Sequence, residues 1–410
     1  MTASDNTQPL PDPERDGAPT PDGDAVGRAT VPGPEAVGRA AIPVETAHGA
    51  AVATETPYLF EDAVGRAAVP DPTAPPPMAS VREEWPPPRR SSPREPAAPR
   101  PARSHRVWTR GVLAAVAAAL LALILAFHQS VPNDPGNLGS LLETFLPWLG
   151  WLIPPIAVWA LLRRSATAAI VLIAPVIVWS GMYVGLLPDK SSGEGDIRVV
   201  THNVDADNAD IPGTIARLLT ADADVIALQE LTETAMGQYV DGLDDSYPYY
   251  VSHGTVALFS RQAILDSSPV DINIGWTRAM RATIETEQGP MAVYVAHLAS
   301  VRVGSEGFTS QQRDATAEAL GTAIAEEGLE RVLLLGDLNG TMQDRSLAPI
   351  THQLGSTQAE AGTGFGFTWP ASFPMARIDQ ILVRELTSVD SWSLEPTGSD
   401  HLPIAADLDL

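Results

Sequence analysis

The residues best suited to chemistry lie where apolar runs end in polar side chains. The segment Leu334–Gly340, LLGDLNG, passes from an apolar run to a carboxylate and a carboxamide two residues apart. Side chains at this spacing on an extended chain point to the same side, so Asp337 and Asn339 would face a common metal or phosphate. Gly, Asp and Asn are also ordinary turn residues. Taken alone, the segment indicates a turn. Other residues of the chain are needed to distinguish a turn from a metal or phosphate site.

Other polar residues stand at the ends of apolar runs in the same way: Asn203, Glu230, His297, Asp379, Asp400 and His401. Carboxylate and carboxamide oxygens suit Mg²⁺ or Mn²⁺. Two histidines and spare carboxylates supply acid–base chemistry or contacts to phosphate oxygens. Each residue alone has an ordinary structural interpretation as a strand end or a half-buried histidine. Their combination in one order favours a metal-dependent site.

Short apolar strands separated by helices must position these residues. Asp210 is a candidate cap for a helix reaching about Thr220, a short helix follows Glu230, and a longer helix is predicted over 309–327. The chain end reads as a tight turn and an edge strand. This order favours a two-layer or four-layer α/β sandwich over a doubly wound sheet. The predicted strands are Ile197–Val204, Asp224–Leu231, Thr255–Arg261, a hairpin across Gln288–Gly289, Arg331–Asn339 and Arg377–Val383.

The Gly-Asp-x-Asn segment and the terminal Ser-Asp-His, in this order, resemble the endonuclease/exonuclease/phosphatase superfamily over roughly Asp196–Leu410. The resemblance implies a four-layer α/β sandwich of two packed mixed sheets flanked by helices. It also implies a role for each site residue.

In this resemblance, Asn203, Glu230 and Asp400 match the residues of the metal site. His297 matches the histidine that contacts the scissile phosphate, and Asp337 and Asn339 match the pair that orients water and phosphate. Asp379 matches the carboxylate that orients the catalytic histidine, His401.

Two departures from the family pattern bear on the substrate. The carboxylate that some family nucleases pair with the first histidine is replaced after Arg261 by Gln262, Ala263 and Ile264. Basic DNA-binding loops are not evident. Both weaken the nuclease interpretation and leave phosphoester hydrolysis intact.

Three apolar segments precede this domain, over 107–128, 141–162 and 166–187. Each is about as long as the roughly 20 residues that cross a bilayer. We therefore expect a disordered, Pro/Ala-rich tail over 1–104, three transmembrane helices within 105–189 and a catalytic domain over 190–410. The tail carries three imperfect AVGRA repeats, which we interpret as drift in a low-complexity segment.

Charge predicts the orientation of the protein and the class of its partners. The last domain, from Ser191, has 11 Arg, no Lys and 32 Asp plus Glu, so its balance is 11 − 32 = −21, which disfavours duplex binding. The chain has no cysteine, so disulfides and thiolate zinc sites are excluded. Seven arginines precede or open the first apolar segment, which places the tail in the cytoplasm and the last domain outside the plasma membrane: Arg89, Arg90, Arg94, Arg100, Arg103, Arg106 and Arg110.

These observations predict a membrane-anchored, Mg²⁺- or Mn²⁺-dependent phosphoesterase acting on a lipid-linked phosphate or pyrophosphate. The order of helices and domain is also similar to that of actinomycete teicoplanin-resistance membrane proteins. A tethered extracytoplasmic nuclease and a catalytically silent binding or sensor module on the same fold are the alternatives.

Overall fold

The computed structural model of the chain describes residues 110–134, 136–301, 303–304, 307–308 and 310–410. The described residues belong to one compact unit within residues 94–410. The predicted tail over 1–104 and the first residues of the first apolar segment lie outside the described residues.

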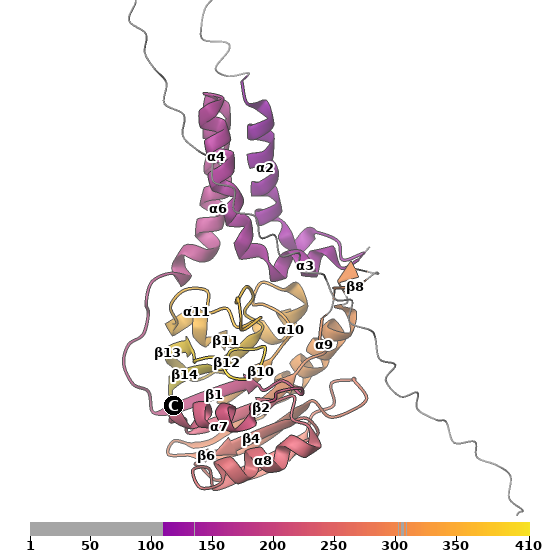
Figure 1. The fold of residues 1–410 in the computed structure, drawn as a ribbon, viewed down its shortest axis with the longest axis vertical. Coiled ribbons are helices and arrows are strands. Elements are labelled where there is room, and N and C mark those ends of the chain that lie inside the picture. Colours follow the sequence, from indigo (N-terminus) through magenta and orange to yellow (C-terminus); the bar gives the residue numbers. More distant parts are fainter. Residues whose placement is uncertain (1–109, 135, 302, 305–306, 309) are drawn as a thin grey trace, which may run out of the picture. The chain divides into compact units, whose positions relative to one another are not determined.

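Two six-stranded mixed sheets form the centre of the domain (Figure 1). The first has the order β13 (Thr387–Ser393), β14 (Ile404–Asp409), β1 (Ile197–Asn203), β2 (Val225–Gln229), β4 (Val256–Ser260) and β3 (Tyr249–His253). The second has the order β11 (Gly355–Ser356), β12 (Asp379–Arg384), β10 (Val332–Asp337), β7 (Gly289–His297), β6 (Ala279–Thr286) and β5 (Ile264–Pro269). A small ribbon joins β8 (Val303–Gly304) and β9 (Gly307–Phe308).

The central strands are apolar on both faces because each sheet is covered twice. Val199 of β1 and Leu333 and Leu335 of β10 belong to the core between the sheets, whereas their neighbours Val200 and Leu334 point outward into separate apolar clusters under the helices. This alternation follows the period of two of a strand. It explains why these strands read as unbroken apolar runs.

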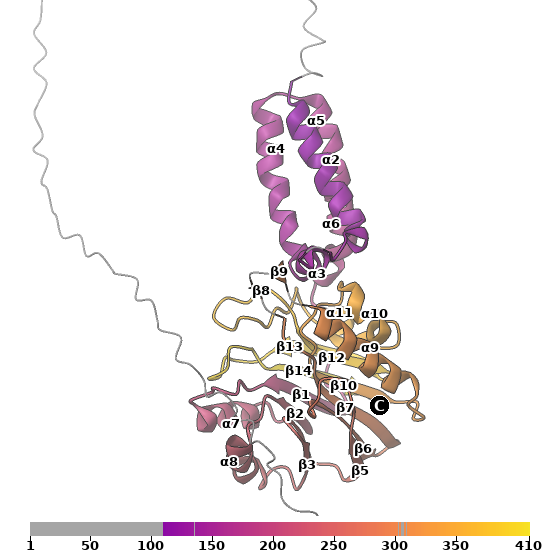
Figure 2. The same cartoon turned by 90° about the vertical axis from the view of Figure 1, so that its right-hand side faces the viewer.

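Helices complete the outer layers (Figure 2). One face carries α7 (Ile211–Thr220) and α8 (Glu233–Leu243), and the other carries α9 (Gln311–Ala325) and α10 (Ala348–Thr351). Two short elements, η4 (Arg345–Leu347) and α11 (Thr357–Ala361), lie in the connections. The predicted cap of α7 is confirmed, because the Asp210 carboxylate accepts a hydrogen bond from the Gly213 N–H at 3.0 Å. The arrangement of two packed mixed sheets flanked by helices is confirmed.

The prediction that the last strand lies at a sheet edge is wrong. Strand β14 pairs with β1 on one side and with β13 on the other. The outer strand β13, TSVDSWS, has too few apolar residues to show a clear alternation, so its pairing was not visible in the sequence. The hairpin before His297 is found, with Thr286 opposite Gly289.

The segment before the domain is helical, but three spanning helices are not confirmed. Its elements are α2 (Val112–Ala126), η1 (His128–Ser130), α3 (Leu138–Thr144), η2 (Leu146–Leu152), α4 (Ile153–Leu162), α5 (Ala166–Val171), α6 (Ile173–Tyr183) and η3 (Val184–Leu186). Among the described residues, Ala166–Leu186 is long and apolar enough to cross a bilayer, and α2 is shorter. The second predicted segment is bent by 74° between Leu138–Thr144 and Leu146–Leu162.

Glu143 explains why the second segment is not one straight span. Its side chain is fully buried, and its Oε1 lies 3.0 Å from Nε of Arg345 in the domain. The backbone carbonyl of Glu143 also accepts a hydrogen bond from Thr341 at 3.3 Å. A buried carboxylate needs such partners, so α3 packs on the domain that follows the helices.

Candidate active site

The predicted site residues converge because parallel strands bring their carboxyl ends to one edge. Strand β1 runs parallel to β2, with Asn203 opposite Gln229, the residue before Glu230. Strand β10 runs parallel to β7, with Asp337 opposite His297, and antiparallel to β12, with Asp337 opposite Asp379. The two sheets thus contribute to one cluster of side chains.

Asp337 is the meeting point of this cluster. Its Oδ2 accepts a hydrogen bond from Nδ2 of Asn203 at 3.1 Å, and it lies 3.6 Å from Nε2 of His297 and 3.8 Å from Nε2 of His401. The side chain is 2 % exposed. Burial raises the pKa of Asp337 to about 7, against the opposing effect of the charge on His401. A carboxylate with a pKa near neutrality is suited to take a proton from water.

The Gly-Asp-x-Asn segment is both a turn and part of the site. The Asn339 N–H donates to Oδ1 of Asp337 at 2.8 Å, and Nδ2 of Asn339 donates to Oδ2 at 3.2 Å. Asn339 adopts a left-handed φ of 49°, which Asn tolerates better than most residues. A Cβ at Gly336 would overlap the carbonyl oxygen of Ala296 on β7, so the glycine allows the two strands to approach.

His401 and Asp379 form a charged pair. Nδ1 of His401 lies 2.9 Å from Oδ2 and 3.1 Å from Oδ1 of Asp379. Burial disfavours the charged ring, but Asp379 and Asp337 outweigh it and raise the pKa of His401 to about 10. Burial likewise disfavours ionisation of Asp379, yet the charge on His401 holds the pKa of that carboxyl below its usual value. The pair therefore presents a protonated Nε2 toward Asp337 at neutral pH.

The sequence reasoning missed Arg278, which stands directly before β6 and is 8 % exposed. Its guanidinium donates to Nε2 of His297, and its carbonyl accepts from the His297 N–H at 2.8 Å. Burial lowers the pKa of Arg278, while Asp337 and Glu230 support its charge. Burial, with the charge on Arg278, lowers the pKa of His297 well below its usual value, so His297 is neutral. An arginine directly before an apolar strand was the available signal.

Of the three predicted metal ligands, Asn203 is buried, whereas the side chain of Glu230 is 28 % exposed. The Asn203 amide donates to Oε1 of Glu230 at 3.2 Å, and Glu230 holds a left-handed φ of 63°. Asp400 is 58 % exposed and accepts a hydrogen bond from the indole of Trp369 at 3.1 Å. Asp205, which the sequence reasoning also missed, lies nearby. Burial raises the pKa of Asp205, and the charges on Asp400 and Glu230 add to that effect.

Two carboxylate groupings are candidates to hold a cation. Donor atoms of Asp337, Asp379 and His401 all lie within 4.8 Å of one another. A protonated His401 paired with Asp379 has no free lone pair for a metal. Glu230, Asn203 and Asp400 offer oxygen donors of the kind that a hard divalent cation prefers.

A family model matches the part of the chain that contains this site. Residues 200–401 match the Endonuclease/Exonuclease/phosphatase family, and the matched range contains every site residue predicted from the sequence. No curated protein sequence matches the chain.

Solved structures with a similar fold include three that cover 52 % of this chain and 99 % of their own. TDP2 of D. rerio, complexed with single strand DNA product, has 19 % identity and a TM-score of 0.46. A mannosyl-6-phosphatase of Bacteroides thetaiotaomicron has 16 % identity and a TM-score of 0.43. A beta toxin variant of Staphylococcus aureus with bound magnesium ions has 15 % identity and a TM-score of 0.40. At these values the likenesses carry no argument about substrate.

Proposed function

We propose that the domain over 190–410, whose residues 200–401 match the endonuclease/exonuclease/phosphatase family, is a metal-dependent phosphoester hydrolase. The observation that carries the proposal is the convergence on Asp337. A carboxylate with a pKa near 7, a protonated histidine, a neutral histidine and a buried guanidinium surround one point beside three oxygen donors. Such a set supplies a base, hydrogen-bond donors and a cation site together.

In the proposed mechanism Asp337, oriented by Asn339 and Asn203, accepts a proton from the attacking water. The water oxygen forms a bond to phosphorus, and the bond to the ester or pyrophosphate oxygen breaks. The protonated His401, held by Asp379, and the guanidinium of Arg278 donate hydrogen bonds to oxygens on which negative charge develops. His297 is neutral and accepts from Arg278, so it positions that guanidinium.

Glu230, Asn203 and Asp400 are the residues that would hold Mg²⁺ or Mn²⁺. When bound, the cation withdraws charge from a phosphoryl oxygen.

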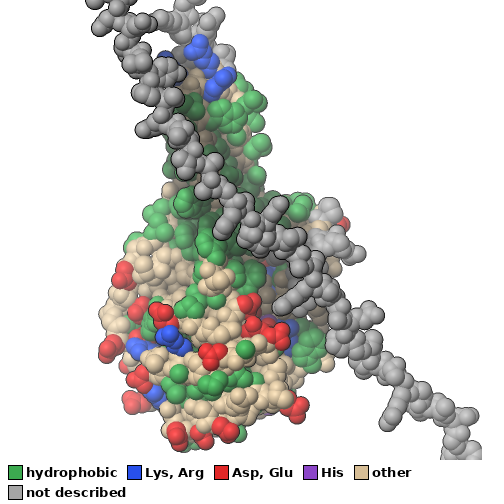
Figure 3. Space-filling view, in the orientation of Figure 1, with side chains coloured by type: hydrophobic (Ala, Val, Ile, Leu, Met, Phe, Trp, Pro, Cys, Tyr) green, Lys and Arg blue, Asp and Glu red, His purple; other side chains and the backbone are tan. Residues whose placement is uncertain are grey.

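The proposed substrate is a lipid-linked phosphate or pyrophosphate at the outer face of the plasma membrane. Large apolar side chains are exposed on α2, α4 and α6, with Leu113 70 %, Leu162 78 % and Ile177 64 % exposed. Figure 3 shows hydrophobic side chains gathered over this helical segment and acidic ones over the domain. An apolar surface this extensive is unusual for a soluble protein, and it supports membrane anchoring.

The test uses the full-length protein in detergent micelles with a lipid diphosphate, bis(p-nitrophenyl) phosphate and plasmid DNA. We expect hydrolysis of the first two that is lost in Asp337→Ala. No hydrolysis of any phosphoester would overturn the proposal. Faster cleavage of plasmid DNA than of lipid diphosphate at equal phosphate would replace the lipid substrate with nucleic acid. Protease added to protoplasts should trim the domain after Leu187; protection of the domain would reverse the orientation.

A further inference from the structure

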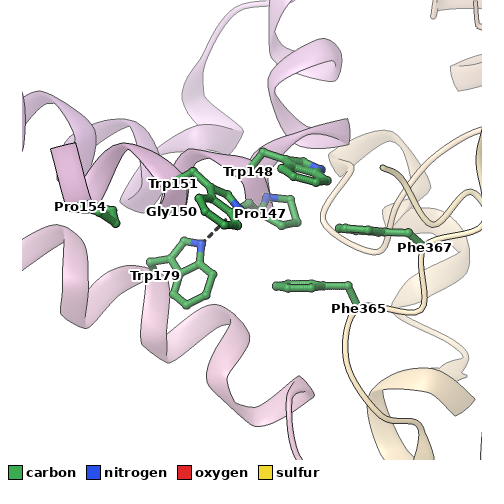
Figure 4. Close-up of a pocket in the computed structure, with 8 residues that line it drawn as sticks. All are labelled: Pro147, Trp148, Gly150, Trp151, Pro154, Trp179, Phe365 and Phe367. Atoms are coloured by element: carbon green, nitrogen blue, oxygen red, sulfur yellow. Dashed lines mark hydrogen bonds between the residues drawn. The ribbon is translucent and has the colours of Figure 1, made fainter. Parts of the chain in front are cut away.

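We propose that a cavity between the helical segment and the catalytic domain binds the hydrocarbon chain of the substrate. This inference rests on the proposed function. The cavity has a volume of about 470 Å³, within the range of roughly 300–1,000 Å³ typical of ligand pockets. We call it the aromatic pocket and define it by Trp148, Trp151, Trp179, Phe365 and Phe367, which line it with Pro147, Gly150 and Pro154 (Figure 4).

The aromatic pocket is lined by apolar and aromatic side chains, and two of its indole N–H groups already have partners within the protein. The indole N–H of Trp148 donates to the carbonyl of Met375 at 2.8 Å, and that of Trp179 donates to the carbonyl of Pro147 at 2.9 Å. The ring faces therefore remain for a ligand, and the side chains that line the cavity carry no charge. A pocket of this kind favours a hydrocarbon over a sugar, a nucleotide or a peptide.

The local sequence builds this lining. Phe365 and Phe367 follow Gly364 and Gly366, whose φ values of 70° and 57° are left-handed and suit glycine. The two phenyl rings stack with centroids 5.1 Å apart, and Phe367 stacks on Trp148 at 5.7 Å. Figure 4 shows both rings pointing from the domain toward the helices. Opposite them, a Cβ at Gly150 would overlap Trp179, so the glycine admits that indole.

The backbone segment that carries Phe367 continues directly to the proposed active site. Trp369 follows Phe367 by two residues, a separation of at most about 7 Å along the backbone. Its indole donates to Asp400, one of the proposed metal ligands. The backbone of Trp369 also pairs with Ala376, next to the Met375 carbonyl that receives Trp148. A chain lying in the pocket would thus begin close to the phosphate position.

The helical side of the pocket supports a membrane lipid as the source of that chain. Trp179 belongs to the apolar helix Ala166–Leu186, and Trp151 is 71 % exposed. Aromatic side chains of this type are enriched where a protein meets the interface of a bilayer. The pocket therefore lies between the proposed anchor and the proposed site, where a lipid chain attached to a phosphate would pass.

The test compares geranyl, farnesyl and geranylgeranyl diphosphate, which share one headgroup, with the full-length protein in detergent micelles. Burial of each added methylene is worth about fourfold in affinity, so kcat/KM of the wild type should rise by more than tenfold over the series. In Phe367→Ala and Trp179→Ala this rise should flatten, with hydrolysis of bis(p-nitrophenyl) phosphate unchanged. Tyr249→Ala, on the edge strand β3, is the matched aromatic control and should keep the full rise.

A binding measurement on a protein with an intact pocket tests the proposal even if the pocket variants fail to fold. In Asp337→Asn, a diphosphate with a brominated chain should quench tryptophan fluorescence saturably, and geranylgeranyl diphosphate but not inorganic diphosphate should reverse the quenching. Equal chain-length dependence in wild type and folded pocket variants would overturn the pocket and leave the hydrolase standing. Absence of all hydrolysis would overturn the proposed function. In that case reversible quenching would still support binding of a hydrocarbon chain in the pocket. Absence of reversible quenching would reject the pocket proposal.

Discussion

Nδ1 of His401, in the loop before β14, lies 2.9 Å from the carboxylate of Asp379, the first residue of β12, which is 22 residues earlier in the chain. This contact decides the protonation state of the ring, because both groups are buried and Asp379 stabilises the imidazolium. The positive charge faces Asp337, the proposed base. The pair thus ties a donor and a base into one charged network.

Replacing Asp379 tests this network. In Asp379→Asn the pKa of His401 should fall from about 10 toward its usual value, because the carboxylate that most stabilises the protonated ring is lost. We expect kcat to drop by about 10²–10⁴-fold. The basic limb of the pH–rate profile should also move to lower pH. A profile of unchanged shape would show that Asp379 serves only packing.

The second prediction concerns Asp337. Asp337→Asn keeps the size of the side chain and removes the carboxylate, so hydrolysis of bis(p-nitrophenyl) phosphate should be lost by about 10³-fold or more. The melting temperature should change little, because burial of that carboxylate is itself unfavourable. Circular dichroism during heating gives the control. A folded variant with near wild-type turnover would remove Asp337 from the mechanism.

Arg278 provides a third test. Arg278→Lys retains a positive charge but not the planar pair of donors, so kcat/KM should fall by about 10²-fold. Arg278→Met should fall further, with the pKa of His297 rising because the adjacent charge is gone. NMR of the histidine rings follows that pKa directly. Equal activity of the Lys and Arg proteins would show that charge alone is required.

The fourth prediction concerns the cation. Chelation with excess EDTA should abolish hydrolysis, and Mg²⁺ or Mn²⁺ should restore it. Binding of either ion should also raise the melting temperature, since a ligand that binds the folded state stabilises it. In Glu230→Gln both effects should require higher ion concentrations. Glu318→Gln, at an exposed position of α9, is the matched control. Full activity in EDTA would contradict the metal requirement.

A fifth prediction concerns acid stability away from the site. Burial disfavours ionisation of Glu327, but hydrogen bonds from Arg281, the Leu329 N–H and Tyr294 outweigh it and hold its pKa at about 2. The stabilisation is complete above the unfolded pKa of 4.5 and is lost as the pH falls toward 2. Glu327→Gln should lower the free energy of unfolding by up to about 3 kcal/mol at pH 6.

The difference in unfolding free energy between wild type and Glu327→Gln should shrink between pH 4.5 and pH 2. Urea unfolding at several pH values measures it. A difference that does not depend on pH would place the contribution of Glu327 in packing. The experiment is independent of activity, so it tests the fold alone.

Much of the site was visible in the sequence because its residues have local signatures. The Gly-Asp-x-Asn segment combines a strand end with a turn, and both features follow from neighbouring residues. The same is true of Glu230 and His297, which end apolar strands. Their combination in one order predicted a metal-dependent site, and the structure shows that parallel pairing of β1 with β2 and of β7 with β10 brings their carboxyl ends together.

Other features depend on contacts that sequence patterns do not encode. Arg278 reaches His297 only because β6 pairs with β7, and an arginine before a strand is otherwise unremarkable. The position of β14 inside its sheet depends on β13, whose polar sequence shows little alternation. The sequence likewise predicted three transmembrane helices and did not show that the Glu143 side chain contacts Arg345 in the domain.

The aromatic pocket shows the same division. The apolar helix that carries Trp179 is evident in the sequence, as are the glycines that precede Phe365 and Phe367. That these rings line one cavity depends on tertiary packing, because Trp148 and Phe367 are more than two hundred residues apart. Local sequence patterns indicate the secondary structure that each segment favours, whereas the contacts between distant segments depend on tertiary packing. The strands and the candidate site residues at their ends therefore follow from the sequence, and the aromatic pocket follows from the fold.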